Sequence, residues 1–502
     1  MSGKRARAFR KVGGLKPGRS VFDLTHEHKT TCDMGQLIPI FWDELSPGDR
    51  YTLHNEVVIR LQPTVAPVLH EINVYTHTFF VPLRLLYAEW ENFIRRGEDG
   101  DTDIPLPVRD DYASLATEFT LLDYFGCPLG INPVGAYPLL WPWRSYNLIW
   151  NEYYRDQELQ DEVDLDQNEV LHRCWEKDYF TIARPSQQRG TPMAIPLSGL
   201  GSVKFTGPVI DNQNPAGSQY LGLTAGLSEV IGNGGRGTGF RDNWLAQNEL
   251  DFSKAGTFDV RDLRVVTQLQ KWQERNMRAG TRYNEMLRAQ HGVAPRDDRL
   301  QRPEYIGGTK SPVIISEVLQ TSSSDATSPQ GNLAGHGIVA DRTKIGTYFA
   351  EEYGVIMTLL SVMPRTMYQQ GIRRQLLRRT VFDYYWRTFA NLSEQAVMMA
   401  EVYATNDAAT NMEVFGYQGQ YDEMRYIPSY VTGGMRNTFD YWHLSRKFAN
   451  KPLLNSSFVE CRPDKRIFAS QNEHGLLVSY ATLLQGVRQM PVMADPGRLD
   501  HF

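Results

Sequence analysis

The chain has 502 residues, of which 41% are hydrophobic and 22% charged, and its formal net charge is −5 at pH 7. These values are ordinary for a globular protein that buries a sizeable core, and the overall charge does not indicate a nucleic-acid binder. Four widely spaced cysteines without a C-x-x-C motif favour reduced thiols and a cytosolic site of assembly over a disulfide framework. No apolar run approaches the roughly 20 residues of a membrane span, and residues 1–20 lack the apolar segment of a secretory signal.

The first twenty residues carry a local positive charge that the overall value conceals. They contain no acidic residue and seven basic ones: Lys4, Arg5, Arg7, Arg10, Lys11, Lys16 and Arg19. Gly13, Gly14, Pro17 and Gly18 disfavour regular structure there, so we expect a flexible basic arm over residues 1–20. The arm is either a solvated or localising tail or a segment that neutralises phosphates by releasing their counterions. The residues alone leave both interpretations open.

Residues 55–82 hold two apolar, β-branched runs, at 57–61 and 68–81, which favour strands over helices. Pro63, Pro67 and Pro82 cannot donate to a sheet ladder, so they are expected at strand ends or edges. In the second run both parities carry apolar side chains. We therefore expect this strand to be covered on both faces, within a sandwich or at a subunit contact.

The middle of the chain contains a long glycine-rich segment. Residues 199–240 include eleven glycines, and residues 232–239 read GNGGRGTG. A phosphate-binding loop is not supported, because the G-K-[ST] ending and a clean strand-to-helix switch are missing. A surface loop is the better interpretation, and loops of this length are usually functional or mobile.

Two helices are predicted after this segment. Residues 259–279 place Leu263, Val266, Leu269 and Trp272 on one stripe, and Gly280 ends the helix. Thr281 can cap a second helix, which His291 and Gly292 close. Residues 259–292 should therefore form a helical hairpin.

Strand-like runs return at residues 353–363, around 417–430 and at 476–484. Strands near both chain ends, with helices and long loops between them, predict a mainly β chain built as an antiparallel sandwich with enlarged loops.

No catalytic motif is present: the chain lacks H-E-x-x-H, G-x-S-x-G and any metal-type cysteine spacing. The pairs His26/His28 and His70/Glu71 fit packed or exposed histidines better than metal ligands. We therefore expect no enzyme activity, no cofactor and no metal site.

Nine blocks of the sequence, in order, resemble the major capsid proteins of microviruses, small icosahedral phages with single-stranded DNA, and most closely those of the gokushovirus-like branch. The blocks are residues 32–39 (CDMGQLIP), 43–49 (DELSPGD), 79–86 (FFVPLRLL), 178–185 (DYFTIARP), 301–308 (QRPEYIGG), 315–321 (ISEVLQT), 363–371 (MPRTMYQQG), 426–429 (YIPS) and 440–444 (DYWHL). Each block alone is weak, whereas together they cover roughly residues 20–490 in the family's order. Residues 199–250 depart most from the shared pattern.

The resemblance implies a basic arm over residues 1–20 and, over residues 21–502, a single eight-stranded antiparallel jelly-roll sandwich with large helical and loop insertions. Sixty copies would assemble in the host cytoplasm into a T=1 icosahedral capsid, so the protein would reside in the virion. The glycine-rich insertion at residues 199–250 would contribute to a threefold protrusion and to host attachment. The two runs within residues 55–82 would be paired early strands, with one face in the sandwich core and the other under insertions or a neighbouring subunit.

The resemblance also implies partners. These are other copies of the chain, a circular single-stranded DNA genome, a small basic DNA-binding protein, a DNA pilot protein, an internal scaffolding protein and a receptor on the bacterial surface. The seven basic arm residues would then lie on the inner face against the genome, as an auxiliary to the small basic protein. A second basic cluster, Arg373, Arg374, Arg378 and Arg379, would face DNA or make salt bridges between subunits.

An alternative from another class is a cytosolic β-sandwich enzyme or carbohydrate-binding protein with a mobile glycine-rich lid. It predicts a small soluble oligomer with a cleft of convergent polar groups, whereas the capsid hypothesis predicts particles of megadalton mass that protect DNA.

Overall fold

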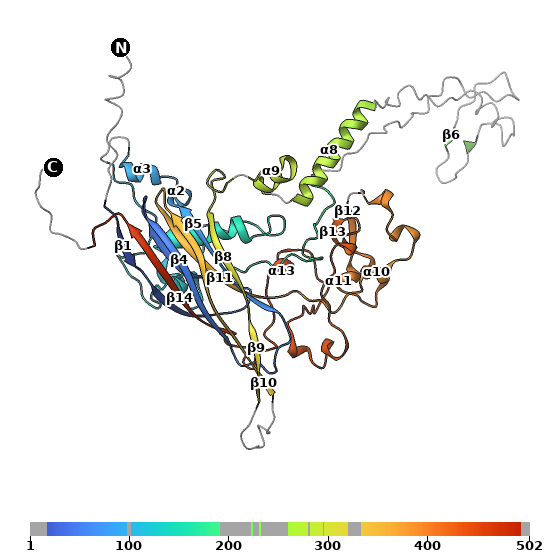
Figure 1. The fold of residues 1–502 in the computed structure, drawn as a ribbon. Coiled ribbons are helices and arrows are strands. Elements are labelled where there is room, and N and C mark those ends of the chain that lie inside the picture. The colour runs from blue at the N-terminus through green and yellow to red at the C-terminus, as the bar shows by residue number, and fades with distance from the viewer. Residues whose placement is uncertain are drawn as a thin grey trace, which may run out of the picture. The chain divides into compact units, whose positions relative to one another are not determined.

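The computed structural model describes residues 18–97, 102–190, 222–223, 230–231, 260–279, 282–294, 296–319, 333–390, 392 and 394–492 (Figure 1). The chain divides into two compact units, one formed by Met1–Gln187 with Met277–Phe502 and the other by Gln188–Asn276. Both large sheets belong to the first unit. No helix among the described residues is both long and apolar enough to cross a membrane.

Two antiparallel sheets dominate the first unit, as the prediction of a mainly β chain requires. The larger has the strand order β1-β14-β4-β10-β9, and β2 also pairs with β14; the smaller has the order β3-β11-β5-β8. The larger sheet consists of β1 (Ser20–Asp23), β2 (His26–Cys32), β4 (Arg50–Leu61), β9 (Ile314–Leu319), β10 (Leu333–Phe349) and β14 (Leu476–Arg488). The smaller consists of β3 (Ile38–Leu45), β5 (Ile72–Pro82), β8 (Glu304–Pro312) and β11 (Gly354–Pro364).

Burial in β4 follows the two-residue period of a strand with one face on a core. Alternate residues from Tyr51 to Leu61 are buried, whereas Arg50, Glu56 and Arg60 are exposed. The buried set packs into the core between the two sheets, together with the buried face of β14. The three exposed residues of β4 are all charged, as expected for the solvent-facing side of such a strand.

β5 is covered on both faces, which confirms the prediction from its two apolar parities. Every residue in it is buried except His77, which is half-buried. Ile72, Val74 and Phe80 belong to the core between the sheets. Phe79 and Val81 belong to a second core, against helix α6 (Trp141–Ile149).

The expectation that the two runs of residues 55–82 pair with each other is wrong. β4 lies in the larger sheet and β5 in the smaller one. The chain crosses between the sheets at residues 62–71, where Pro63 and Pro67 offer no N–H to a ladder. The second strand also begins at Ile72 rather than at 68.

Short helices and turns cover the outer face of the smaller sheet and extend the loops. They are α2 (Leu83–Leu86), α3 (Trp90–Arg95), α4 (Tyr112–Leu115), α5 (Leu121–Tyr124), α6 and a π-helical turn (Trp150–Tyr154). Trp141, Trp143 and Trp150 are buried in the second core. These three tryptophans therefore serve as core rather than as part of an exposed surface.

The C-terminal third adds a small lobe around a third core. Its elements are α10 (Arg374–Leu377), β12 (Glu394–Met398), α11 (Met399–Val402), α12 (Ala408–Met412), β13 (Val414–Gly419) and α13 (Ser456–Val459), with 3₁₀ turns at Val381–Asp383, Arg387–Phe389, Asp422–Met424, Gly433–Arg436 and Asp440–Trp442. β12 pairs with β13. The strand predicted around residues 417–430 ends at Gly419, and Tyr421 (φ 63°) turns the chain into the left-handed region.

Helices α8 (Val260–Ala279) and α9 (Tyr283–His291) occupy the positions that the sequence predicts. Gly292 ends α9 in the left-handed conformation (φ 71°). On α8, Leu269 and Trp272 of the predicted stripe are exposed, and the side chain of Leu263 lies outside the described residues. The glycine-rich segment also lies outside them, apart from the paired strands β6 (Gly222–Leu223) and β7 (Val230–Ile231).

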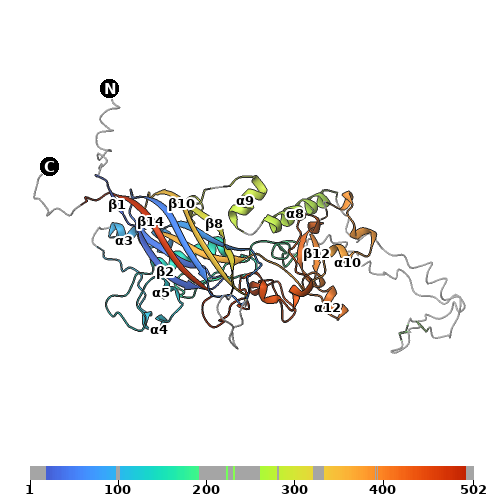
Figure 2. The same cartoon turned by 60° about the horizontal axis from the view of Figure 1, so that its bottom comes forward.

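The two ends of the described chain meet at one edge strand. β1 pairs only with β14, and Ser20 lies opposite Arg488 in the register. Figure 2 shows β1 and β14 side by side in the larger sheet. Ser20 and Arg488 are therefore neighbours in space.

Candidate functional site

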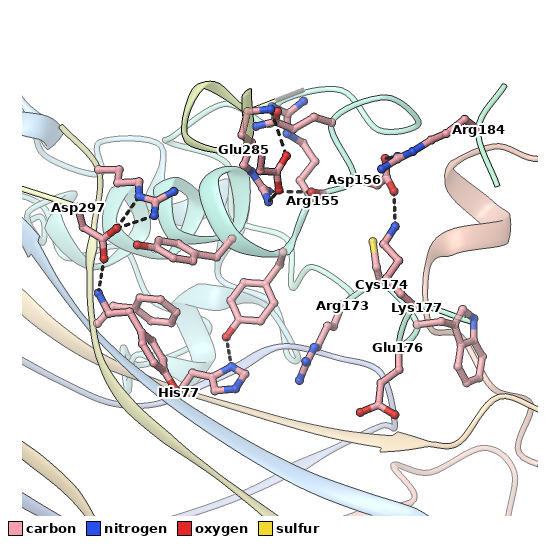
Figure 3. A pocket seen from close by; sticks show the side chains of 18 residues that line it. His77, Arg155, Asp156, Arg173, Cys174, Glu176, Lys177, Arg184, Glu285 and Asp297 are labelled. Carbon is pink, nitrogen blue, oxygen red and sulfur yellow. Dashed lines mark hydrogen bonds and ion pairs between the residues drawn. The ribbon is translucent and has the colours of Figure 1, made fainter. Parts of the chain in front are cut away.

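A cavity of about 880 Å³ opens in the first unit beside the outer face of β5 (Figure 3). Its wall comes from β5, the π-helical turn, the loops at residues 155–157 and 173–177, α9 and the start of β8. These stretches are far apart in the sequence and meet because α6 packs on the smaller sheet. The volume falls within the range of small-molecule sites.

Aromatic rings form one side of the cavity. Phe79 of β5 packs against Tyr153 and Tyr305, with ring centroids 4.8 and 5.4 Å apart. Nδ1 of His77 lies 2.7 Å from the Tyr154 hydroxyl, so the two groups share a hydrogen bond. This side offers flat apolar faces with polar edges.

Charged side chains form the rest of the wall, and most of them are paired. Lys177 Nζ lies 2.6 Å from Asp156, and Arg184 Nη1 lies 3.6 Å from the same carboxylate. Arg302 Nε donates to Asp297 at 2.8 Å. Burial alone would raise the pKa of Asp156, but Lys177 and Arg184 lower it below its usual value. The carboxylate is therefore ionised and holds two cations in place.

Arg173 differs from its neighbours because it makes no ion pair with a carboxylate of the described chain. Its guanidinium lies over the rings of Tyr75 (4.4 Å) and Tyr154 (5.7 Å) and donates to the Ser361 hydroxyl at 3.2 Å. Figure 3 shows it pointing into the space between His77 and Glu176. The cavity can thus hold a small ligand that has both a flat face and a negative charge.

Two titratable side chains of the cavity, His77 and Cys174, are held in their neutral forms near pH 7. Burial, and then the charge of Arg173, lowers the pKa of His77 to about 4. Burial raises the pKa of Cys174 to about 11. Among the described residues, no three His, Cys, Asp or Glu side chains gather as a metal site would require. The chemistry on offer here is binding by fixed charges and rings.

A second feature is a run of exposed apolar side chains in the C-terminal lobe, which we call the aromatic surface. It consists of Leu376, Val381, Phe382, Tyr384, Tyr385 and Trp386, all exposed. The exposed fractions of Leu376 and Phe382 are 70% and 69%. Contiguous exposed apolar surface on a folded chain marks an interaction site more often than chance packing.

Two buried ion pairs hold the aromatic surface in place. Arg374 pairs with Glu401 at 2.9 Å and Arg378 with Glu423 at 3.3 Å, and the carboxylate side chains are only 2% and 4% exposed. The backbone carbonyl of Val381 accepts a hydrogen bond from Trp386 Nε1 at 2.9 Å. These two arginines thus act within the chain, contrary to the expectation that they face DNA or another subunit.

The other two arginines of this predicted cluster are not ion-paired with any described carboxylate. Arg373 lies over the ring of Tyr430 at 5.4 Å, and the side chain of Arg379 donates only to backbone carbonyls. The sequence shows four adjacent cations but not which two are buried against acids, because Glu401 and Glu423 lie more than twenty residues away.

Of the predicted arm residues, Lys4, Arg5, Arg7, Arg10, Lys11 and Lys16 lie outside the described residues. Arg19 is exposed, and its guanidinium lies 5.6 Å from the centre of the Phe349 ring. The cavity residues have no signal in the sequence, because no local motif joins β5, residues 173–177 and α9.

The chain is similar in sequence to capsid proteins. A family model described as capsid protein (F protein) matches residues 11–498. The capsid protein VP1 of Chlamydia phage 1 is 33% identical, with 95% of each chain covered. The capsid proteins VP1 of Bdellovibrio phage phiMH2K and Spiroplasma virus 4 are 32% and 29% identical, with 90% and 95% of each chain covered.

Proposed function

Because this chain belongs to the F capsid protein family of microviruses and is a major capsid protein of their virions, we propose that sixty copies form a T=1 icosahedral shell around a circular single-stranded DNA genome. The family match over residues 11–498 carries this proposal. It also sets aside the alternative of a cytosolic β-sandwich enzyme or carbohydrate-binding protein.

The fold proposed for the shell-forming domain is a single eight-stranded jelly roll. Two four-stranded halves support it: β2-β14-β4-β10 in the larger sheet and β3-β11-β5-β8 in the smaller sheet. Most strands that follow one another among these eight, such as β2 and β3 or β4 and β5, lie in different halves, whereas β5 and β8 pair within the smaller sheet. That alternation is what a jelly roll requires, and it leaves few free edges. β1 and β9 are additions at the two ends of the larger sheet.

Residues 1–20 are proposed to face the genome, with Lys4, Arg5, Arg7, Arg10, Lys11, Lys16 and Arg19 as phosphate partners. Residues 199–250 are proposed to form part of a threefold protrusion that contacts the host receptor, and residues 259–292 to act as a helical insertion. A small basic DNA-binding protein, a DNA pilot protein and an internal scaffolding protein are the proposed virion partners. The family membership supports these assignments.

Assembly can be tested by expressing the chain alone and together with the other virion proteins of its phage. We expect particles of megadalton mass by electron microscopy and light scattering, containing DNA that resists nuclease. Small oligomers under both conditions, from a chain that melts cooperatively, would contradict the proposal. Particles formed only with the partners would support assembly and identify the need for scaffolding.

A further inference from the structure

We propose that the aromatic surface docks on an acidic surface of a second copy of this chain, as one of the contacts that close the shell. The inference rests on the proposed assembly and names a surface for it. It follows from the order, the exposure and the charge of residues 373–387.

The aromatic surface is exposed although its backbone is fixed. Both ion pairs use carboxylates that are almost fully buried, and Gln395 donates to Glu423 at 2.7 Å. Thr380 and Asp383 form a capping box around the 3₁₀ turn, and the Tyr421 hydroxyl donates to the Tyr384 carbonyl at 3.2 Å. A segment anchored this way pays little ordering entropy on binding, which favours a preformed contact.

The composition fits a protein partner better than DNA. The most exposed side chains are Leu376, Val381 and Phe382, which have no affinity for phosphate. Two of the nearby arginines are used inside the chain. Tyrosine, tryptophan and arginine around an apolar centre are the residues enriched in protein interfaces.

The charges of this segment favour docking on an acidic surface of another copy of the chain, rather than on that copy's own aromatic surface. Arg373, Arg379 and Arg387 have no ion pair with a described carboxylate, whereas Asp383 is the only acid among residues 373–387. Two aromatic surfaces facing each other would bring these cations together. Outside the basic arm the chain has 46 basic and 58 acidic residues, so acidic side chains outnumber basic ones over the rest of the chain. A contact between two different surfaces also propagates around a ring, which a closed shell needs.

Paired substitutions test the apolar part. Phe382→Asp should reduce the yield of particles at least tenfold, whereas Phe382→Leu keeps an apolar side chain and should leave the yield within twofold of wild type. Arg387→Glu and Arg387→Lys form a second pair, which tests the charged part. The Glu variant should reduce the particle yield at least tenfold, and the Lys variant should leave it within twofold of wild type. Because positions 382 and 387 are both exposed, all four variants should melt as unassembled chains at the wild-type temperature.

A photoreactive benzophenone amino acid at position 382 identifies the occupant. Irradiated particles should yield chain–chain adducts that join position 382 to a peptide rich in Asp and Glu. Adducts to DNA, adducts between two copies of residues 373–387, or no adducts in intact particles would overturn the inference. So would wild-type particle yields from folded Phe382→Asp. If wild-type chains form no particles even with their partners, the proposed assembly itself fails, and this inference fails with it.

Discussion

At the scale of single residues, the C-terminal lobe depends on carboxylates buried beside arginines. Glu401 accepts hydrogen bonds from Arg374, from the Tyr179 hydroxyl at 2.8 Å and from the Met398 N–H at 3.0 Å. Burial nevertheless raises the pKa of Glu401 above its ordinary value, while these partners lower it less. The folded state therefore binds a proton at Glu401 more tightly than the unfolded chain does.

Removing the arginine should destabilise the folded chain in a pH-dependent way. Arg374→Met leaves a buried carboxylate without its cation, so we expect the free energy of unfolding at pH 7 to fall by about 3 kcal/mol. A raised folded-state pKa means that stability decreases as pH rises above the ordinary value of 4.5. Without Arg374 the pKa rises further, so the cost of the substitution should be larger at pH 7 than at pH 5.

Urea unfolding of the unassembled chain at both pH values measures this difference. Arg379→Met is the matched control, because Arg379 is exposed and its side chain donates only to backbone carbonyls. An equal cost for Arg374→Met at pH 5 and pH 7 would show that the ion pair does not set the stability of this lobe.

At the scale of elements, β4 and β5 show how burial on one face or two faces follows from sequence. β4 alternates buried and exposed side chains, and β5 lies between the sandwich core and the layer of α6. Substitutions on their outward faces should therefore have opposite consequences.

Val74→Asp and Val81→Asp should both abolish soluble, folded expression, because each places a charge in one of the two cores that β5 separates. Val58→Asp, on the outward and half-buried face of β4, should still give a folded chain. Circular dichroism and melting of the purified chains provide the comparison. Folded Val81→Asp would mean that the layer of α6 does not seal β5.

The sequence predicted that β5 is buried on both faces, but it did not predict which sheet β5 joins. Apolar side chains at both odd and even positions indicate that both faces of the strand are buried. Strand pairing depends instead on distant residues, since Ile72 lies opposite Pro364 of β11, almost three hundred residues away. The same limit applies to the cavity, whose Arg173, His77 and Arg282 share no local pattern. The four clustered arginines were visible in the sequence, but their buried acids were not.

At the scale of the whole molecule, charge is divided between a basic arm and an acidic remainder. Replacing all seven basic arm residues by Gln should lower the DNA content of purified particles. For the unassembled chain, the salt dependence of binding to oligodeoxythymidine should weaken by about 5 in log–log slope, since each lost single-strand contact removes roughly 0.7.

Absorbance ratios and phosphate analysis of the particles measure the DNA content. Exchanging Lys for Arg and Arg for Lys at the same seven positions keeps the charge and serves as the control. Normal DNA content in the Gln variant would assign the arm another role.

The pairing of β1 with β14 has a mechanical consequence. β1 is a four-residue edge strand held by a single neighbour, whereas β14 is also bonded to β4 and β2. DNA leaving the particle would put tension on the arm. That tension would act on β1 at its first residue, Ser20, and would break the few β1–β14 hydrogen bonds one after another. β14 would stay clamped within the sheet. Tension from the genome would therefore detach β1 alone and leave the other strands of the larger sheet paired.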